Sequence, residues 1–494
     1  MKILIYVLSY IVMIGFLYFK TSLFISQYYD AHRMILLEKQ RYKEWNTNIL
    51  KLLPFSFLFL SFGFIFYNSL IANFLVLVAM TFELIELKKI LFKFTRRSIT
   101  LLIFSSLLPL ISLININYIA YSLMVLLIVF QSSLTILSNY ILLPIELIIR
   151  SHYIRQVKRK INNAKNLKII AITGSYGKTS FKNYLYYILC GKYNVLKTPG
   201  SVNTPLGICK FINNNLTPYE DILILELGVD APNTMKKFFK MFRPTIGIVT
   251  AIGEMHLATF KTIENIQKEK LSLFDEISDP NGMFYNKDSP YMELDKNYKK
   301  VAHPYSLNDV SDITYSINGT EFIYKNNKCT VNVLGKYQLT NLIGAIKVSE
   351  YLGLSFDYIF KRLSLIRPEQ HRMSITSTNS TTYIDDSYNA NYLGLSEAIN
   401  IVGSLSGKKG IILNGIIEAG SSGEKQNYEI GQMLKTFDEI VVLASSNEKL
   451  IEGLEKSKKK YKKCATYQEG LLFLKKKKLN YVLLCSRAEK DFLK

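Results

Sequence analysis

The chain has 494 residues, with 61 Lys and Arg against 39 Asp and Glu and a formal net charge of +22. This length exceeds what one ordinary hydrophobic core supports, so at least two folding units are expected. The basic residues are spread along the chain, which disfavours nucleic acid and favours a membrane surface as the anionic partner. The five Cys show no CxxC spacing, which disfavours a zinc site and a disulfide framework.

The first 150 residues are dominated by apolar side chains and predict membrane-spanning helices. One span needs roughly 20 apolar residues, so the apolar stretches predict about five spans. Basic residues fall on one side of these spans, which predicts a multi-pass protein of the cell membrane with its second half in the cytoplasm. The acidic residues Glu83 and Glu86 lie at a span end, which favours an anchor over a transport pathway. The predicted spans fall within 3–18, 53–87, 100–113 and 118–137.

A short apolar run at 167–172 predicts a buried strand, and a glycine-rich loop and a helical pattern follow it directly. In this order, loop N–H groups and the helix N-terminus can bind phosphate. Lys178 can neutralise phosphate charge, and the Thr179 hydroxyl can bind Mg²⁺. The predicted ATP-binding residues of the loop are Gly174, Ser175, Gly177, Lys178, Thr179 and Ser180.

Two later apolar runs, at 222–228 and 246–252, predict further strands of the same parallel sheet. The first contains Glu226 near its end, and His256 follows the second. Open α/β sheets gather their binding residues at the carboxyl ends of the strands, so both side chains are expected near the phosphate loop.

The shortened loop GSYGKT, the sequence TPGSVNTPLG at 198–207 and GKYQLTN at 335–341 together resemble the Mur ligase family, which includes folylpolyglutamate synthetases. The resemblance implies an ATP- and Mg²⁺-dependent ligase with a carbamylated lysine. Chemistry alone does not separate Lys268 from Lys270, but the Leu-Ser-Leu-Phe that follows resembles the family and selects Lys270. A carbamate would supply the oxygen ligand that Mg²⁺ prefers. The implied catalytic residues are Lys178, His256 and Lys270, and the implied metal ligands are Thr179, Glu226, His256 and Lys270.

The segment 365–373 predicts a linker to a C-terminal domain. The resemblance implies that Arg372 contacts ATP across the domain junction, that Asn341 contacts the adenine and that Asp386 faces the ribose. The implied substrate contacts are Ser201, Asn203, Thr204, Asn389 and Asn391.

The sequence DDSYNAN at 385–391 resembles the branch of the family that adds D-alanyl-D-alanine to UDP-N-acetylmuramoyl-tripeptide. The chain departs from the family pattern at Tyr392, where proline is usual, and at Cys485, which stands within the place of a Lys-Gly pair. These departures leave the substrate as the least constrained part of the interpretation.

The expected architecture has three parts. A transmembrane helical bundle at 1–150 stands in place of a UDP-binding domain, an α/β P-loop domain with a mostly parallel sheet occupies 151–367, and a smaller Rossmann-like α/β domain occupies 368–494. The expected reaction is amide-bond formation through an acyl phosphate in peptidoglycan precursor synthesis. Expected partners are a peptide-bearing acceptor, an amino acid or dipeptide, the membrane and other membrane-bound cell-wall enzymes, but not nucleic acid.

Three alternatives stay open. A ligase of the same superfamily acting on another membrane-associated or polymeric acceptor would differ in the amine that it consumes. A non-catalytic membrane scaffold is disfavoured, because the lysine, threonine, glutamate and histidine at the phosphate and metal positions are present. An ATP-driven transporter is disfavoured because the apolar segments lack a polar pathway.

Overall fold

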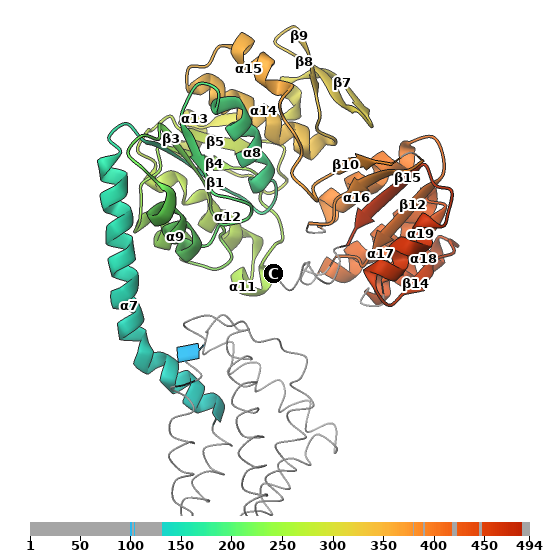
Figure 1. Cartoon of the computed structure of the whole chain (residues 1–494), viewed down its shortest axis with the longest axis horizontal. Coiled ribbons are helices and arrows are strands. Elements are labelled where there is room, and N and C mark those ends of the chain that lie inside the picture. The colour runs from blue at the N-terminus through green and yellow to red at the C-terminus, as the bar shows by residue number, and fades with distance from the viewer. Residues whose placement is uncertain are drawn as a thin grey trace, which may run out of the picture. The chain divides into compact units, whose positions relative to one another are not determined.

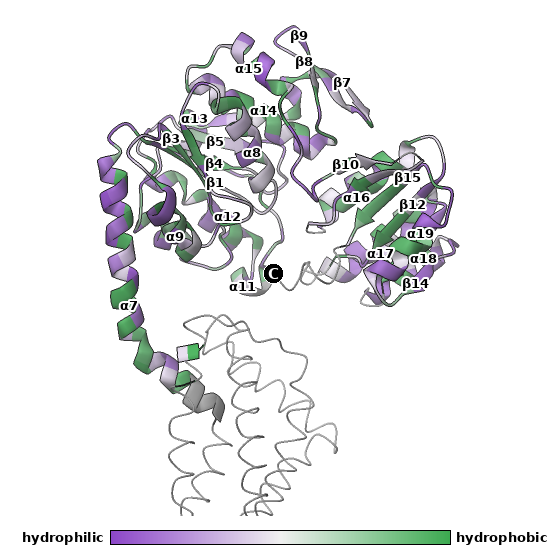
Figure 2. Ribbon diagram, in the orientation of Figure 1, coloured by the Kyte–Doolittle hydropathy of each residue, from purple (hydrophilic) through white to green (hydrophobic). Residues whose placement is uncertain are grey.

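The computed structural model describes residues 99–100, 103 and 131–486, except 379, 389–390, 417–421 and 444–446 (Figure 1). The chain divides into two compact units, Met1–His152 and Tyr153–Lys494. The second unit holds two α/β sheets, and Figure 2 shows apolar strands at the centre of each sheet between helices with hydrophilic outer surfaces.

The helix α7 (Gln131–Asn163) overlaps the last predicted span, and Pro144 and Glu146 interrupt its apolar run. Among residues 99–100, 103 and the described parts of 131–486, no helix combines the length and the apolarity that a membrane crossing needs. The prediction of a multi-pass membrane location is therefore wrong for this part of the chain, and membrane docking with other enzymes has no support. The rest of the bundle predicted at 1–150 lies outside the described residues, apart from 99–100 and 103.

The central sheet has six strands in the order β2-β3-β1-β4-β5-β6, and every neighbouring pair is parallel. The chain passes from β1 to one edge of the sheet and then returns past β1 to β4. This reversal of direction creates a crevice at the carboxyl ends of the central strands, where open α/β sheets bind ligands. The strands are β1 (Lys168–Thr173), β2 (Val195–Lys197), β3 (Ile222–Glu226), β4 (Ile246–Val249), β5 (Met283–Asn286) and β6 (His303–Tyr305).

Both faces of this sheet are buried, which explains the continuous apolar runs of its strands. Ile170 and Ile172 of β1 pack into a core with α8, α14 and α15, whereas Ile169 and Ala171 pack into a second core with α9, α10 and α12. The helices are α8 (Lys178–Leu189), α9 (Pro205–Asn215), α10 (Thr234–Phe239), α11 (Leu257–Phe260), α12 (Ile263–Leu271), η1 (Phe274–Glu276), α13 (Lys296–Val301), η2 (Leu307–Asp309), α14 (Lys336–Tyr351) and α15 (Phe356–Leu363).

A small antiparallel sheet follows β6 and comprises β7 (Ser311–Ser316), β8 (Gly319–Tyr324) and β9 (Asn327–Val331). Its buried side chains, which include Phe322 and Val331, join the core beside α14. This sheet was not predicted from the sequence.

The second large sheet has the order β10-β11-β15-β12-β13-β14, and it is parallel except for the edge strand β10. The prediction of a multi-domain α/β fold with a parallel central sheet is thus confirmed. The strands are β10 (Ser374–Ser377), β11 (Thr382–Asp385), β12 (Lys409–Leu413), β13 (Glu439–Leu443), β14 (Lys462–Cys464) and β15 (Tyr481–Cys485). The helices are α16 (Tyr392–Ser404), α17 (Gly423–Met433), η4 (Leu434–Thr436), α18 (Glu448–Lys456) and α19 (Tyr467–Lys475).

Candidate active site

The glycine loop lies between the end of β1 and the start of α8, as its sequence predicts. Gly174 has a φ of +150°, and a Cβ there would lie 2.1 Å from the Thr250 hydroxyl. Gly177 has a φ of +81° at the N-cap of α8, where no side chain caps the helix. The loop therefore needs glycine at both positions, and it leaves the helix N-terminus open to an anion.

Lys178 lies at the first position of α8 and folds back over the loop. Its Nζ donates hydrogen bonds to the carbonyl oxygens of Gly174, at 2.6 Å, and Ser175, at 3.3 Å. Burial lowers the pKa of Lys178 to about 8, against the opposing effect of the Glu226 charge. A phosphate beside this ammonium would satisfy a partly buried cation whose hydrogen bonds go only to neutral carbonyls.

Glu226 is the last residue of β3 and is buried against α8. Its Oε2 accepts a hydrogen bond from Lys182 Nζ at 2.8 Å, and its Oε1 accepts one from the Asn203 amide at 3.2 Å. Burial acts to raise the pKa of Glu226, but the charges of Lys182 and Lys178 hold that pKa below its ordinary value. Glu226 is therefore an anion within the site.

Lys270 lies on α12 and is 2% exposed. Its Nζ donates a hydrogen bond to the Val229 carbonyl at 3.2 Å. Burial, followed by the nearby Lys178 charge, holds the pKa of Lys270 well below its usual value, while Asp230 opposes the shift. A lowered pKa increases the fraction of neutral amine, which is the nucleophilic form of a lysine.

These groups surround one cavity of about 350 Å³. The structure thus brings together side chains that are far apart in the sequence. The predicted site residues that line this cavity are Gly174, Ser175, Gly177, Lys178, Thr179, Asn203, Thr204, Glu226, His256, Lys270, Arg372 and Asn391.

The oxygen donors of this cavity fit Mg²⁺ when a phosphate is also present. Among the described residues, no group of three or more His, Cys, Asp and Glu side chains could hold a metal ion alone. Mg²⁺ in phosphate sites usually takes only one or two carboxylates and completes its shell with phosphate and water oxygens. Thr179 and Glu226 provide such a partial set, and a carbamate on Lys270 would add a further oxygen.

A second cavity, of about 360 Å³, adjoins the first and shares Tyr176, Gly177 and Arg372 with it. Asn341 and Asp386 line it, together with Ser180. Burial raises the pKa of Asp386 to about 6, against the opposing effect of the Arg372 charge. The residues predicted to contact the adenine and ribose therefore lie in one cavity beside the phosphate loop.

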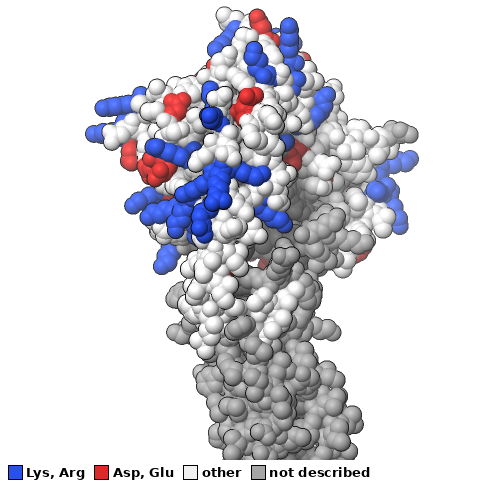
Figure 3. Space-filling model, turned by 60° about the vertical axis from the view of Figure 1, so that its left-hand side comes forward, with Lys and Arg blue, Asp and Glu red and all other residues white. Residues whose placement is uncertain are grey.

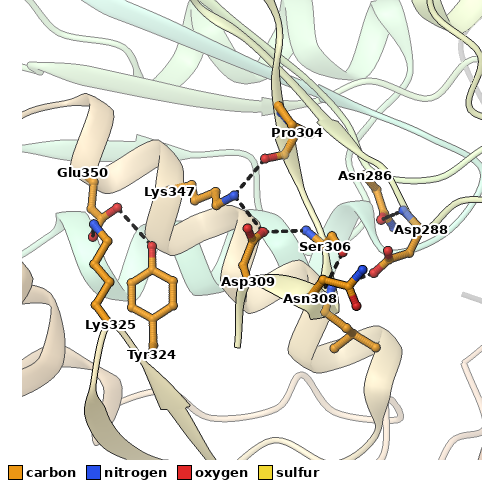
Figure 4. Close-up of polar contacts among 11 residues, drawn as sticks. Asn286, Asp288, Pro304, Ser306, Asn308, Asp309, Tyr324, Lys325, Lys347 and Glu350 are labelled. Carbon is orange, nitrogen blue, oxygen red and sulfur yellow. Dashed lines mark hydrogen bonds and ion pairs between the residues drawn. The ribbon is translucent and has the colours of Figure 1, made fainter. Parts of the chain in front are cut away.

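Two polar residues of the second cavity, Asn286 and Asp288, were missed by the sequence analysis (Figure 4). The Asn286 side chain accepts a hydrogen bond from the Asp288 amide at 2.9 Å, and Asp288 Oδ2 accepts one from the Leu307 amide at 2.7 Å. The signal that could have revealed them is the polar sequence Asn-Lys-Asp-Ser at 286–289, which begins at the last residue of β5.

The turn that closes this end of the cavity is held by a second polar cluster (Figure 4). Asp309 accepts a hydrogen bond from the Ser306 amide and pairs with Lys347 of α14 at 2.7 Å. Lys347 also donates to the Pro304 carbonyl at 2.9 Å. These contacts fix η2 against α14, the helix that carries Asn341.

Of the implied substrate residues, Asn203, Thr204 and Asn391 line the first cavity. The Ser201 and Tyr388 hydroxyls form a short hydrogen bond. Thr204 caps α9 by accepting from the Gly207 amide at 3.2 Å, and Asn391 caps α16 by accepting from the Gly394 amide at 3.0 Å. Asn389 lies outside the described residues.

The family model of the Mur ligase middle domain matches residues 172–349. This segment is similar to the Mur ligase middle domain. It contains the phosphate loop, Glu226, His256, Lys270 and Asn341.

Curated relatives extend the likeness beyond the Mur ligase middle domain. The UDP-N-acetylmuramoyl-tripeptide–D-alanyl-D-alanine ligase of Bacillus subtilis is 29% identical over 278 residues, which are 54% of this chain and 60% of that protein. The ligase of the same name from Buchnera aphidicola is 28% identical over 347 residues, which are 67% of this chain and 75% of that protein. The chain thus spans less than two thirds of the length of the first relative.

Solved structures show the same fold around the Mur ligase middle domain. The MurF ligase from Thermotoga maritima, crystallised in complex with ADP, has a TM-score of 0.59 and 24% identity, with coverage of 68% of this chain and 80% of that one. MurF from Acinetobacter baumannii has a TM-score of 0.59 and 23% identity, with coverage of 68% and 76%.

Proposed function

We propose that the chain is an ATP-dependent ligase of peptidoglycan precursor synthesis that adds D-alanyl-D-alanine to UDP-N-acetylmuramoyl-tripeptide. The observation that carries this proposal is the cavity in which Lys178, Glu226, Lys270 and Arg372 meet beside an uncapped helix N-terminus. Its support comes from the names of the curated relatives and from the DDSYNAN sequence at 385–391.

ATP would place its phosphates over the N-terminus of α8 and its adenosine in the second cavity. Asn341 would contact the adenine and Asp386 the ribose, because both line that cavity. Of the other loop residues, Ser175 lines the first cavity and Ser180 lines the second. This placement directs the terminal phosphate towards the first cavity, where the two reacting substrates would meet it.

The reaction has two steps. A carboxylate oxygen of the peptide attacks the terminal phosphorus of ATP, and the bond to ADP breaks to leave an acyl phosphate. The amine then attacks the acyl carbon, phosphate departs with the carboxylate oxygen, and the amine loses a proton as the amide forms. Lys178 and Arg372 offset the charge on the phosphate oxygens, and their fixed positions supply most of the catalysis expected of phosphoryl transfer.

Mg²⁺, when bound, would neutralise part of the phosphate charge, and Thr179, Glu226, His256 and carbamylated Lys270 would hold it. The carbamate would form when the neutral Nζ of Lys270 attacks carbon dioxide, makes an N–C bond and releases a proton. The lowered pKa of Lys270 favours this step, because it increases the fraction of neutral amine. The new carboxylate would lie in the same cavity as Lys178 and Glu226.

The test is phosphate release by the purified full chain with Mg²⁺, ATP and UDP-N-acetylmuramoyl-tripeptide. D-alanyl-D-alanine, single amino acids and no amine are compared in parallel. The proposal expects release only with D-alanyl-D-alanine, together with a product of the ligated mass. Phosphate release with a single amino acid instead would mean that the chain uses a different amine substrate. No release with any amine would contradict ligase activity on this acceptor.

A further inference from the structure

Lys182 is a buried cation one turn after Lys178 on α8. Many Lys and Arg side chains lie at the surface, as Figure 3 shows for one face, but Lys182 is 0% exposed. Its Nζ donates to Glu226 Oε2 at 2.8 Å and to the Gly200 carbonyl at 2.5 Å. One ammonium thus joins the phosphate-loop helix, the end of β3 and the loop before α9.

This ion pair differs from the surface pairs of the chain. The side chains of Lys182 and Glu226 are 1% and 2% exposed, whereas those of Lys347 and Asp309 are 24% and 29% exposed. Burial of two charges costs free energy that only good geometry and further hydrogen bonds recover. The pair is present despite this cost, and it lies at the wall of the first cavity. We therefore expect it to do more than stabilise the fold.

The geometry determines what the pair does to Glu226. Lys182 occupies Oε2 and Asn203 occupies Oε1, so the orientation of the carboxylate is fixed from two sides. Lys182 and Asn203 also tie this carboxylate to the loop at 198–204, which carries the implied substrate contacts Ser201 and Thr204. The position of the Glu226 carboxylate is therefore fixed both by the loop at 198–204 and by α8.

We propose that Lys182 is a positioning residue that orients the Glu226 carboxylate and limits its affinity for the divalent cation. The inference rests on the proposed function, in which Glu226 binds Mg²⁺ beside the ATP phosphates. An ammonium at hydrogen-bond distance neutralises much of the carboxylate charge, so a cation is attracted less strongly. Removal of the ammonium would strengthen cation binding and at the same time free the carboxylate to turn.

The test compares Lys182→Met with the wild-type full chain. Mn²⁺ is titrated in the presence of ADP, and free Mn²⁺ is followed by electron paramagnetic resonance. We expect half-saturation at an about tenfold lower Mn²⁺ concentration, and turnover in the phosphate-release assay that is at least about tenfold slower. Lys182→Arg, which keeps the charge, should bind Mn²⁺ nearly as the wild type does, and Lys237→Met, an exposed lysine of α10, is the matched control.

A purely structural role predicts a different pattern. Turnover would then fall together with the thermal unfolding temperature, and Mn²⁺ affinity would be unchanged; this result overturns the inference. Lys182→Gln keeps a hydrogen-bond donor and removes the charge, so it gives the same test if Lys182→Met does not fold. A wild-type chain that neither binds Mn²⁺ with ADP nor releases phosphate would contradict the proposed function, whereas an active wild type with unchanged Mn²⁺ affinity in both variants would contradict only the inference.

Discussion

Arg372 Nη2 donates a hydrogen bond to the Thr179 hydroxyl at 3.1 Å, which joins the segment before β10 to the phosphate loop. The guanidinium also lies 4.1 Å from the centre of the Tyr388 ring. Its buried Nε has no hydrogen-bond partner among the described residues. A buried donor in this state is costly, and a phosphate oxygen would satisfy it.

The planar guanidinium of Arg372 gives a prediction for Arg372→Lys. A lysine keeps the charge but cannot present several N–H groups in one plane, so the KM for ATP should rise about tenfold or more. Steady-state phosphate release over a range of ATP concentrations measures this change. An unchanged KM would show that the Arg372 guanidinium does not contact ATP. Arg367→Lys, in the same linker, serves as the control.

A pH dependence follows from Lys178, whose pKa is lowered to about 8 by burial. The ammonium that attracts phosphate is present below this pKa and is lost as the pH rises through it. The kcat/KM for ATP should therefore fall by up to about tenfold per pH unit above about 8. Lys178→Arg stays charged to a much higher pH, so whatever activity it retains should lack this fall.

Gly174 gives a test of the loop conformation. In Gly174→Ala the new Cβ would clash with the Thr250 hydroxyl and the Ala251 backbone, so nucleotide binding measured by calorimetry should be lost. Gly353→Ala is the matched control, because Gly353 also has a positive φ, of +88°, but no atom within 4 Å of the added Cβ. Normal nucleotide binding by Gly174→Ala would contradict the proposed role of the loop.

Carbamylation of Lys270 predicts that activity depends on carbon dioxide. Lys270→Ala should lose at least about a hundredfold in turnover, and a small carboxylic acid such as acetate should restore part of it by replacing the missing oxygens. Mass spectrometry of the intact protein under mild conditions would reveal the added carbon dioxide directly. Full activity of Lys270→Ala would contradict any role for a carbamate.

The strand and the helix on either side of the glycine loop lie where the sequence predicted them. The strand, the glycine loop and α8 are consecutive in the chain, so periodicity and glycine spacing were sufficient to find them. The strand that ends at Glu226 and the strand before His256 were found for the same reason. Both residues were expected beside the phosphate loop, because the carboxyl ends of parallel strands lie at the same edge of a sheet.

Other features depend on contacts between distant residues, and the sequence analysis missed them. Lys182 lies in a helical pattern where a lysine is usually exposed, and only the approach of β3 makes it a buried partner of Glu226. Asn286 and Asp288 were missed because their environment depends on a later part of the chain. Asp288 accepts a hydrogen bond from the amide of Leu307, which lies in η2. The multi-pass location was predicted wrongly because the apolar run at 131–137, the described part of the last predicted span, continues into α7, where Pro144 and Glu146 interrupt it.

In the proposed reaction, a substrate carboxylate is activated by ATP before the amide forms. The most direct measurement uses UDP-N-acetylmuramoyl-tripeptide labelled with ¹⁸O in its reacting carboxylate, together with D-alanyl-D-alanine, Mg²⁺ and ATP. One ¹⁸O is expected in each phosphate released, because the carboxylate oxygen leaves with phosphorus, and no labelled phosphate is expected from Lys178→Ala. Phosphate without ¹⁸O, released at the wild-type rate, would mean that water attacks ATP and would contradict the acyl-phosphate reaction.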